Sequence, residues 1–239
     1  MTSLEDSLQT TADALARRLD AIFAQLTTLS EAAAGILSGT SSGSRASRSS
    51  LESLRPAVED LISEQEGLVD SAGVSVAPGV VADAEVWHQW WSLIDGRVAF
   101  IPHNLNPASV NYYDYTEMTW FERPFTSGSP ELTGPYIDFG GAFDMKVVTA
   151  GRPVGEPTKP LGIVGADLSM DSLEREFLRH LGRQREHVAL VTETGKVVAS
   201  NSARYAPGTR FEGPQISLLS IPVPAAELAS PPWRIVVTD

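Results

Sequence analysis

The chain has 239 residues, of which 42% are apolar and 20% are charged, a composition typical of a globular protein with a substantial core. Acidic residues outnumber basic ones by 30 to 18, and the formal net charge of −12 argues against binding to nucleic acid or anionic lipid through bulk charge. The absence of cysteine excludes disulfides, thiolate catalysis and cysteine-bound metal.

The N-terminus has acidic residues where a secretion signal needs positive charge followed by an apolar run. Nor does the sequence contain the roughly 18 consecutive apolar residues that a membrane span requires. As the chain is written, we therefore expect a cytoplasmic protein without direct membrane insertion. If the chain is an excised ectodomain, the expected location is extracytoplasmic.

A long amphipathic helix is predicted from Leu4, with Thr2 and Glu5 as a capping box. Apolar residues recur at steps of three, four or seven and so share one helical stripe: Leu8, Leu15, Leu19, Ile22, Leu26, Leu29, Ala33 and Ile36. The stripe either packs on its own domain or forms a seam with a second copy of the chain, which would give a homodimer through the N-terminal helix.

Residues 39–50 are rich in Ser, Gly and Arg, which predicts a flexible connection. A second amphipathic helix is predicted over residues 51–69, because Ser49 and Glu52 repeat the capping signal in front of its apolar residues. Pro56 is compatible with this helix only near its first turn.

After Gly73 the pattern changes to short β-rich runs separated by Gly, Pro and Asp, which indicates antiparallel strands. Asp95-Gly96 suits a tight turn and predicts a hairpin with arms at 86–94 and 97–101. Further elements are expected in this order: strands at 74–76, 143–150 and 161–167, a loop at 151–160, a helix at 171–182, and strands at 188–192, 196–200, 217–222 and 233–238.

These elements predict an α+β fold, in which long N-terminal helices flank a PAS-like twisted antiparallel sheet and a smaller second α/β module follows. We expect an N-terminal helical region at 1–70, a ligand-binding module at 71–170, and a connecting helix with a small second sheet at 171–239.

Three short segments together resemble Cache sensor domains of the double-Cache type, a fold related to PAS domains. They are YDYTEMTWF at 113–121, PYID at 135–138 and LGIVGADLSMDSL at 161–173. Their order and spacing carry the resemblance. It implies a small-molecule sensor in which the aromatic segment lies over the ligand pocket and the strand ending in Gly-x-Asp contributes a carboxylate.

In the amino-acid-binding Cache subgroup the motif consists of Tyr, four residues, Arg, one residue, Trp-Tyr and a distant Asp. Tyr113, Trp120 and Asp167 match this motif, whereas Met118 stands at the arginine position and Phe121 at the second aromatic. The guanidinium that would hold an α-carboxylate in two hydrogen bonds is therefore missing. The resemblance also implies that Tyr136 and Asp138 form a turn near the pocket.

The residues themselves leave alternatives open. The aromatic segment is too irregular for helix or strand periodicity, and it either closes the core or forms a ligand wall. Asp167 follows an apolar run and either contacts a ligand or serves as a cap or structural hydrogen-bond partner. Tyr136 and Asp138 are otherwise a buried tyrosine and a turn aspartate.

An enzyme is not predicted, because no nucleophile elbow, phosphate-binding loop or dinucleotide motif is present. Asp138, Asp144 and Asp167 would act in acid–base chemistry only if the fold paired them. The four histidines, His88, His103, His180 and His187, lack metal-ligand spacing, and no cofactor is expected.

The expected function is recognition of a small metabolite, an amine or amino-acid-like molecule, in signal transduction or in transcriptional or transport regulation. Because Met118 replaces the arginine, an amine is preferred over a simple carboxylate. The alternatives are a sensor for a short carboxylate, for which Arg123 or Arg152 would supply the guanidinium, and a ligand-free dimerising adaptor.

Overall fold

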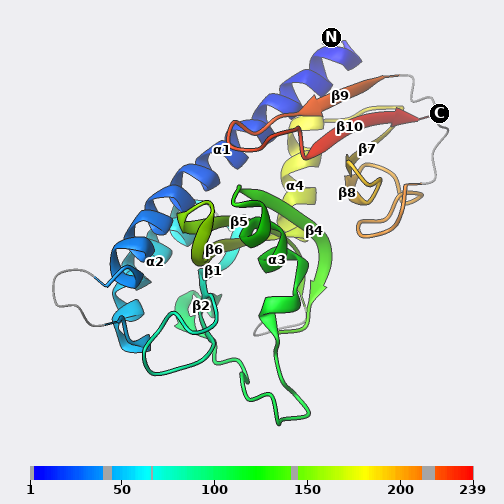
Figure 1. Ribbon diagram of the computed structural model, residues 1–239. Helices are drawn as coiled ribbons and strands as arrows, with labels where there is room; N and C mark the ends of the chain where they lie inside the picture. Colours follow the sequence, from blue (N-terminus) through cyan, green and yellow to red (C-terminus); the bar gives the residue numbers. More distant parts are fainter. Residues whose placement is uncertain (1–2, 40–44, 66, 141–144, 212–218, 239) are drawn as a thin grey trace. The chain divides into compact units, whose positions relative to one another are not determined.

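The computed structural model describes residues 3–39, 45–65, 67–140, 145–211 and 219–238. Its contacts divide the chain into two compact units, one formed by residues 22–168 and the other by residues 1–21 together with 169–239. The fold is α+β, with a long N-terminal helix, a large antiparallel sheet and a second, smaller sheet, as predicted (Figure 1).

The predicted N-terminal helix is α1, Leu4–Leu37. Its cap lies one residue later than expected. The Ser3 backbone N–H donates to the Asp6 carboxylate at 3.2 Å, and the Asp6 backbone N–H donates to Ser3 Oγ at 3.1 Å. Thr2 lies outside the described residues. The apolar stripe is buried from Leu8 to Ala33, and every member but Ile36 is at most 1% exposed. The stripe is thus part of the chain's own core and leaves no seam for a second copy on this face.

The second predicted helix is shorter than expected. A 3₁₀ helix, η1 Arg48–Leu54, precedes α2, Arg55–Glu64, so the end of the expected loop is already helical. The expected helix also ends too late, because residue 69 belongs to a strand. Pro56 lies in the first turn of α2. A backbone N–H has no acceptor within the helix at that position, so the N–H that proline lacks costs no hydrogen bond.

The larger sheet has six strands in the order β3-β2-β1-β6-β5-β4. Their bounds are β1 Val69–Val76, β2 Trp87–Ile94, β3 Arg97–Phe100, β4 Glu131–Asp138, β5 Met145–Glu156 and β6 Lys159–Ser169. The predicted hairpin is confirmed: β2 and β3 pair through Asp95 and Gly96, whose φ angles of 48° and 76° are those that a tight Asp-Gly turn requires.

The two faces of this sheet differ in character because side chains alternate along each strand. On β1, Ala72, Val74 and Val76 are fully buried. The intervening residues are small or polar and face the other way, where Ser71 meets Asp167 and Ser75 meets His88. This second face carries the candidate site.

The loop predicted at residues 151–160 is wrong, because β5 runs to Glu156 and β6 begins at Lys159. Pro153 lies beyond Gly151, where the pairing of β5 with β4 ends at Glu131, so one side of β5 is without a β4 partner at this proline. The Pro153 carbonyl accepts a 2.7 Å hydrogen bond from the Ser30 hydroxyl.

Three elements were not predicted: a 3₁₀ turn, the helix that follows it and the strand β4. The 3₁₀ turn η2, Tyr115–Glu117, and the helix α3, Thr119–Ser127, occupy the aromatic segment that seemed too irregular for either periodicity. In α3, Trp120, Phe121 and Pro124 face inward and are buried. The expected turn at 135–138 is instead part of β4, where a bulge interrupts the pairing with β5.

In the second unit α4, Met170–Leu181, covers the predicted helix and buries Met170, Leu173, Phe177 and Leu181. Its sheet has the order β8-β7-β10-β9 and matches the predicted C-terminal strands. The bounds are β7 His187–Thr192, β8 Val197–Ser200, β9 Ser220–Val223 and β10 Trp233–Thr238. The start of the strand expected at residue 217 lies outside the described residues.

Within the described ranges, no helix combines the length and apolar character needed to cross a bilayer.

Candidate functional site

Two cavities adjoin on the polar face of the six-stranded sheet. The outer chamber has a volume of about 510 Å³ and the inner one about 10 Å³. Both are lined by the same five side chains, His103, Tyr113, Trp120, Tyr136 and Asp138. Only the inner cavity reaches His88, Trp90 and Asp167. The site is therefore a chamber that narrows toward the Asp167 carboxylate.

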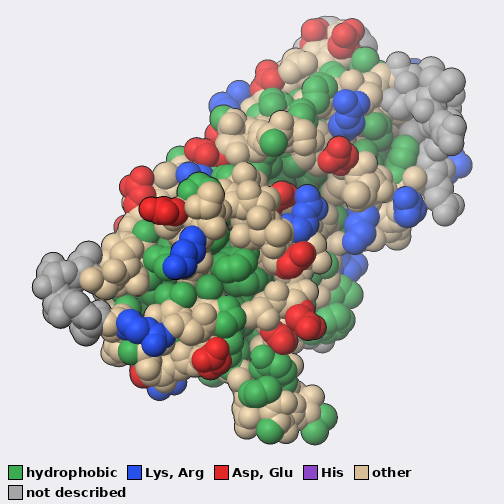
Figure 2. All heavy atoms as spheres, in the orientation of Figure 1, with side chains coloured by type: hydrophobic (Ala, Val, Ile, Leu, Met, Phe, Trp, Pro, Cys, Tyr) green, Lys and Arg blue, Asp and Glu red, His purple; other side chains and the backbone are tan. Residues whose placement is uncertain are grey.

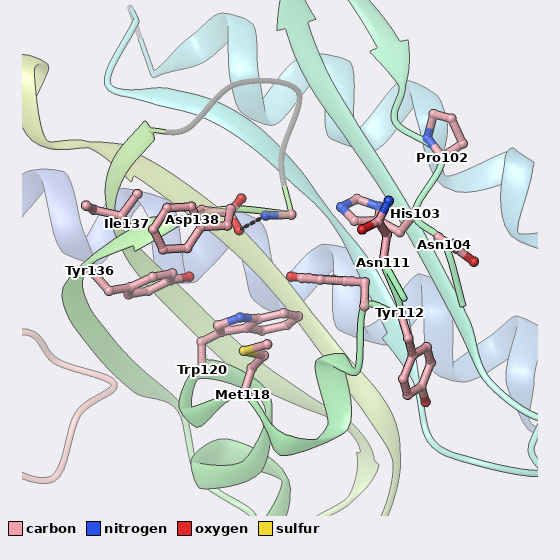
Figure 3. A pocket seen from close by; sticks show the side chains of 13 residues that line it. Pro102, His103, Asn104, Asn111, Tyr112, Met118, Trp120, Tyr136, Ile137 and Asp138 are labelled. Carbon is pink, nitrogen blue, oxygen red and sulfur yellow. Dashed lines mark hydrogen bonds between the residues drawn. The ribbon is translucent and has the colours of Figure 1, made fainter. Parts of the chain in front are cut away.

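The segment between β3 and η2, residues 101–114, supplies much of the outer wall (Figure 1). It projects from the sheet, and Figure 2 shows apolar side chains at the projection. In Figure 3, Trp120 lies near the centre of the view with Met118 beside it, Tyr136 lies to its left, and the Tyr112 ring is turned away. The pocket thus combines residues from one loop, α3 and β4.

Asp167 is the innermost acidic group and is only 6% exposed. One carboxylate oxygen accepts a 2.6 Å hydrogen bond from Ser71 Oγ and a 3.2 Å hydrogen bond from Trp90 Nε1, and the other accepts a 2.6 Å hydrogen bond from Thr149 Oγ1. All three donors are neutral. Since a carboxylate offers about four acceptor positions, three donors leave room for one more.

Burial raises the pKa of Asp167 to about 6, with a further upward contribution from Asp138, while the three hydrogen bonds lower it. No cation among these groups compensates the charge. A buried carboxylate without a cationic partner is costly, and a cationic ligand would remove part of that cost.

Two histidines flank the carboxylates. His88 is fully buried beside Trp90, with its Nδ1 2.7 Å from Ser75 Oγ, and burial together with nearby His103 holds its pKa well below the ordinary value. His103 Nδ1 donates to the Ile101 carbonyl at 3.0 Å, and burial lowers its pKa despite Asp138. At neutral pH both rings are therefore uncharged and leave the site acidic.

Aromatic rings form the remaining walls. The Tyr136 hydroxyl lies 2.5 Å from Thr149 Oγ1, which in turn donates to Asp167, so this tyrosine is linked to the carboxylate through one side chain. Trp120 lies 5.8 Å from both His88 and Trp90, measured between ring centroids. Burial raises the pKa of Tyr113 and Tyr136, which keeps both hydroxyls neutral hydrogen-bond donors.

Neither cavity is lined by a Lys or Arg within the part of the chain that the structure describes. Arg123 pairs with Glu131 at 2.9 Å and is half exposed, and Arg152 does not line the pocket. The guanidinium proposed for a carboxylate ligand is therefore absent from the described walls.

The structure places six of the seven predicted site residues at the two cavities. Tyr113, Trp120, Tyr136 and Asp138 line both, whereas Asp167 lines the inner and Met118 the outer one. Phe121 lines neither, because it lies on α3 and packs behind the pocket against Tyr115 and Phe125. The structure therefore gives no support to its expected place in the ligand wall.

Sequence reasoning missed the contribution of β2 and its neighbours. His88 and Trp90 line the inner pocket, and Ser71 and Thr149 hold the Asp167 carboxylate. The period of two in a strand places residues 88 and 90 on one face, so the predicted hairpin contained the signal for this pair. The sequence contained no signal for Ser71 and Thr149, because their contacts with Asp167 depend on the register between strands.

The same geometry gives little support to a metal. Across the described ranges, no three His, Asp or Glu side chains are grouped so that they could hold a metal ion. What the site offers is one free acceptor position on a buried carboxylate, a second carboxylate, neutral hydroxyl donors and aromatic faces. These features suit the binding of a small molecule.

The family model for the first PDC sensor domain of methyl-accepting chemotaxis protein-like proteins matches residues 101–175, the segment that forms most of this pocket. The chain is also similar in structure to "Methyl-accepting Chemotaxis protein X", at a TM-score of 0.75 and 14% identity, over 99% of this chain and 96% of the other.

Two Pseudomonas chemoreceptor ligand-binding domains are similar as well. The domain of PctB from P. aeruginosa, in complex with L-Gln, has a TM-score of 0.62 at 17% identity, over 98% of this chain and 88% of that one. The domain of CtaA from P. fluorescens, in complex with L-valine, has a TM-score of 0.63 at 16% identity, over 99% and 95%. The chain therefore has the fold of Cache-type sensor domains.

Proposed function

We propose that this chain is the ligand-binding domain of a signal-transduction sensor, and that its ligand is a small molecule carrying an ammonium group. The observation that carries the proposal is the buried Asp167 carboxylate, which has three neutral donors, Asp138 nearby and no basic residue among the described walls. Such a site lacks a positive charge, and an ammonium supplies one.

The aromatic walls support the same class of ligand. Trp120, Tyr113 and Tyr136 present ring faces around the carboxylates, and such faces attract cations within about 6 Å by about 0.5–2 kcal/mol. A hydrogen bond from an ammonium to Asp167 would add on the order of 1.5–3 kcal/mol. Together these interactions favour a cation over a neutral or anionic molecule.

An α-amino acid would bring a carboxylate as well, and that group needs a donor of its own. PctB and CtaA are solved with amino acids. Here Met118 stands at the position that the resemblance assigns to arginine, and Arg123 is engaged with Glu131. The proposed ligand is therefore an amine rather than an amino acid.

The Cache resemblance also supports an extracytoplasmic setting, because such domains sit outside the membrane in chemoreceptors and sensor kinases. We propose that the chain senses its ligand there and that a homodimer, if formed, uses a face other than the buried stripe of α1. Size measurement by light scattering with and without ligand tests the dimer.

A thermal-shift panel of n-alkylamines, amino acids and short carboxylates tests the proposed ligand class. We expect selective stabilisation by amines that is lost in Asp167→Ala and kept in Arg123→Ala, since Arg123 lies on the surface outside both cavities. Stabilisation by carboxylates, abolished by Arg123→Ala, would establish the carboxylate-sensing alternative. A chain that no small molecule stabilises would favour the adaptor.

A further inference from the structure

We propose that the ligand is a primary amine with an extended apolar tail: the inner pocket selects the unsubstituted ammonium, and the outer chamber over Met118, Ile137 and Phe139 selects the tail. This inference rests on the proposed function and adds the chemical class of the ligand at both ends.

The size of the inner pocket limits the group that reaches Asp167. Its volume of about 10 Å³ is close to the minimum of about 10–15 Å³ that a single water needs. An ammonium is about the size of a water, whereas a trimethylammonium is several times larger. The walls are full-sized side chains, among them His88, Trp90 and Trp120, so enlarging the pocket would require repacking.

Hydrogen bonding points the same way as size. The Asp167 carboxylate retains an acceptor position, and only a ligand with N–H groups can use it. Aromatic faces alone would also attract a quaternary ammonium. Such a cation has no N–H and would leave the buried carboxylate without a direct donor, so the combination of carboxylate and small volume favours a primary amine.

The outer chamber is far larger than an ammonium needs. Its volume of about 510 Å³ falls within the range of about 300–1,000 Å³ typical of small-molecule sites. Six large apolar residues are exposed in the described part of the chain: Leu93, Val110, Met118, Ile137, Phe139 and Leu178. Three of the six, Met118, Ile137 and Phe139, line this one chamber.

These three side chains are 38%, 45% and 76% exposed, so each has apolar surface that a ligand tail would cover. Ile137 and Phe139 flank Asp138, which lines both cavities. A ligand whose ammonium lies in the inner pocket would therefore direct its tail past Asp138 onto these side chains. Covering apolar surface in this way strengthens binding in proportion to the area removed from water.

Isothermal titration calorimetry of the purified chain with methylamine, n-butylamine, n-hexylamine and hexyltrimethylammonium tests the inference. We expect affinity to rise about two- to fourfold for each methylene added to the tail. The lower factor corresponds to partial burial of the methylene and the higher one to full burial. Hexyltrimethylammonium should bind at least about tenfold more weakly than n-hexylamine, since it fits neither the volume nor the free acceptor position.

A double variant, Ile137→Ser with Phe139→Ser, should flatten the dependence of affinity on chain length. Leu93→Ser is the matched control, because Leu93 is 39% exposed but lies outside both cavities. It should leave this dependence unchanged. All substituted side chains are exposed, so equal melting temperatures would show that the variants fold normally.

The outcomes separate this inference from the function on which it rests. Amines that bind through Asp167 with an affinity independent of tail length, or a quaternary amine that binds as tightly as n-hexylamine, would overturn the inference and leave the amine sensor standing. If no amine binds at all, both are wrong.

Discussion

Asp167 illustrates how a single side chain links stability and recognition. It is buried among neutral donors on the central strand β6, and its pKa is raised by burial and by Asp138. Such a carboxylate costs the folded chain free energy when no ligand is present. We interpret this cost as the source of the proposed preference for a cation, because a bound ammonium would relieve it.

Asp167→Asn should raise stability at pH 7.5 while abolishing amine binding. The amide keeps one oxygen to accept from Ser71 and Trp90, and its nitrogen can donate to Thr149 Oγ1, which frees the Thr149 hydroxyl for Tyr136. Loss of the buried charge should increase the free energy of unfolding by at most about 3 kcal/mol. Urea denaturation measures this, and a destabilised variant would contradict the account.

The stability of the ligand-free chain should depend on pH through the same group. Since the folded-state pKa of Asp167 is raised from 3.8 to about 6, the folded chain binds its proton more tightly than the unfolded chain does. The Asp167 contribution to stability is thus most favourable below pH 4 and falls as pH rises through about 6. The difference between wild type and Asp167→Asn, followed by denaturation across pH 4–8, isolates it.

Amine affinity should show the opposite pH dependence. An ammonium requires the ionised carboxylate, so affinity should be constant above about pH 7 and fall by up to about tenfold per pH unit below about pH 6. The pKa values of His88 and His103 are lowered, so these side chains gain protons only at still lower pH, where their positive charge should weaken amine binding further. Calorimetry at pH 5, 6, 7 and 8 measures the slope, and a flat profile would exclude Asp167 as the binding group.

At the scale of elements, the pocket floor depends on two neighbouring glycines. Gly73 on β1 pairs with Trp90 on β2 and with Gly165 on β6. A methyl group at Gly73 would lie 2.1 Å from the Gln89 carbonyl oxygen, and one at Gly165 would lie 3.0 Å from the Trp90 ring. Together these glycines leave the space that the Trp90 indole fills beside Asp167.

Gly73→Ala should therefore destabilise the chain by about 1–3 kcal/mol, the range for overpacked sites, because the backbone of β2 must move. Gly35→Ala, within α1 and with nothing within 4 Å of the added methyl, is the control and should stabilise by about 0.5–1 kcal/mol. Thermal melts of both variants measure the contrast; equal effects would refute the close-approach argument.

Local signals in the sequence were sufficient for some elements and insufficient for others. The long stripe of α1 and the Asp95-Gly96 hairpin were predicted because periodicity and turn chemistry are local. The helix α3 was not, since its inward-facing residues Trp120, Phe121 and Pro124 span little more than one turn, too short for a periodic signal. Pro153 suggested a loop because the sequence does not show that β5 continues beyond the point where its pairing with β4 ends.

For the site, the resemblance pointed to Tyr113, Trp120 and Asp167, which the structure brings to the two cavities, and Met118 led us to expect another class of ligand. The environment of Asp167 could not be predicted, because Ser71 and Thr149 lie 96 and 18 residues away in the chain and reach it only through strand register. That Phe121 lines neither cavity could not be predicted for a related reason. On a helix it points about 100° away from Trp120, so only the existence of α3 decides which of the two faces the pocket.

At the scale of the whole molecule, α1 contributes to both compact units, residues 4–21 to one and 22–37 to the other. Leu15→Ala and Leu26→Ala test one buried position in each part, at 1% and 0% exposure. Each should lower the free energy of unfolding by about 2–5 kcal/mol. Exposed Thr28→Ala should change it by less than about 0.5 kcal/mol.

A small loss in either leucine variant would show that the corresponding part of α1 is not integral to its unit. Denaturant unfolding followed by circular dichroism and by tryptophan fluorescence measures both variants under the same conditions.

The central claim is that Asp167 binds an ammonium at the inner end of the pocket, and a crystal structure of the chain with n-hexylamine tests it most directly. The account predicts the amine nitrogen within about 3.2 Å of an Asp167 carboxylate oxygen, with the alkyl chain extending toward Met118 and Ile137. An amine bound elsewhere on the chain, or a nitrogen in the outer chamber with the inner pocket unchanged, would contradict it.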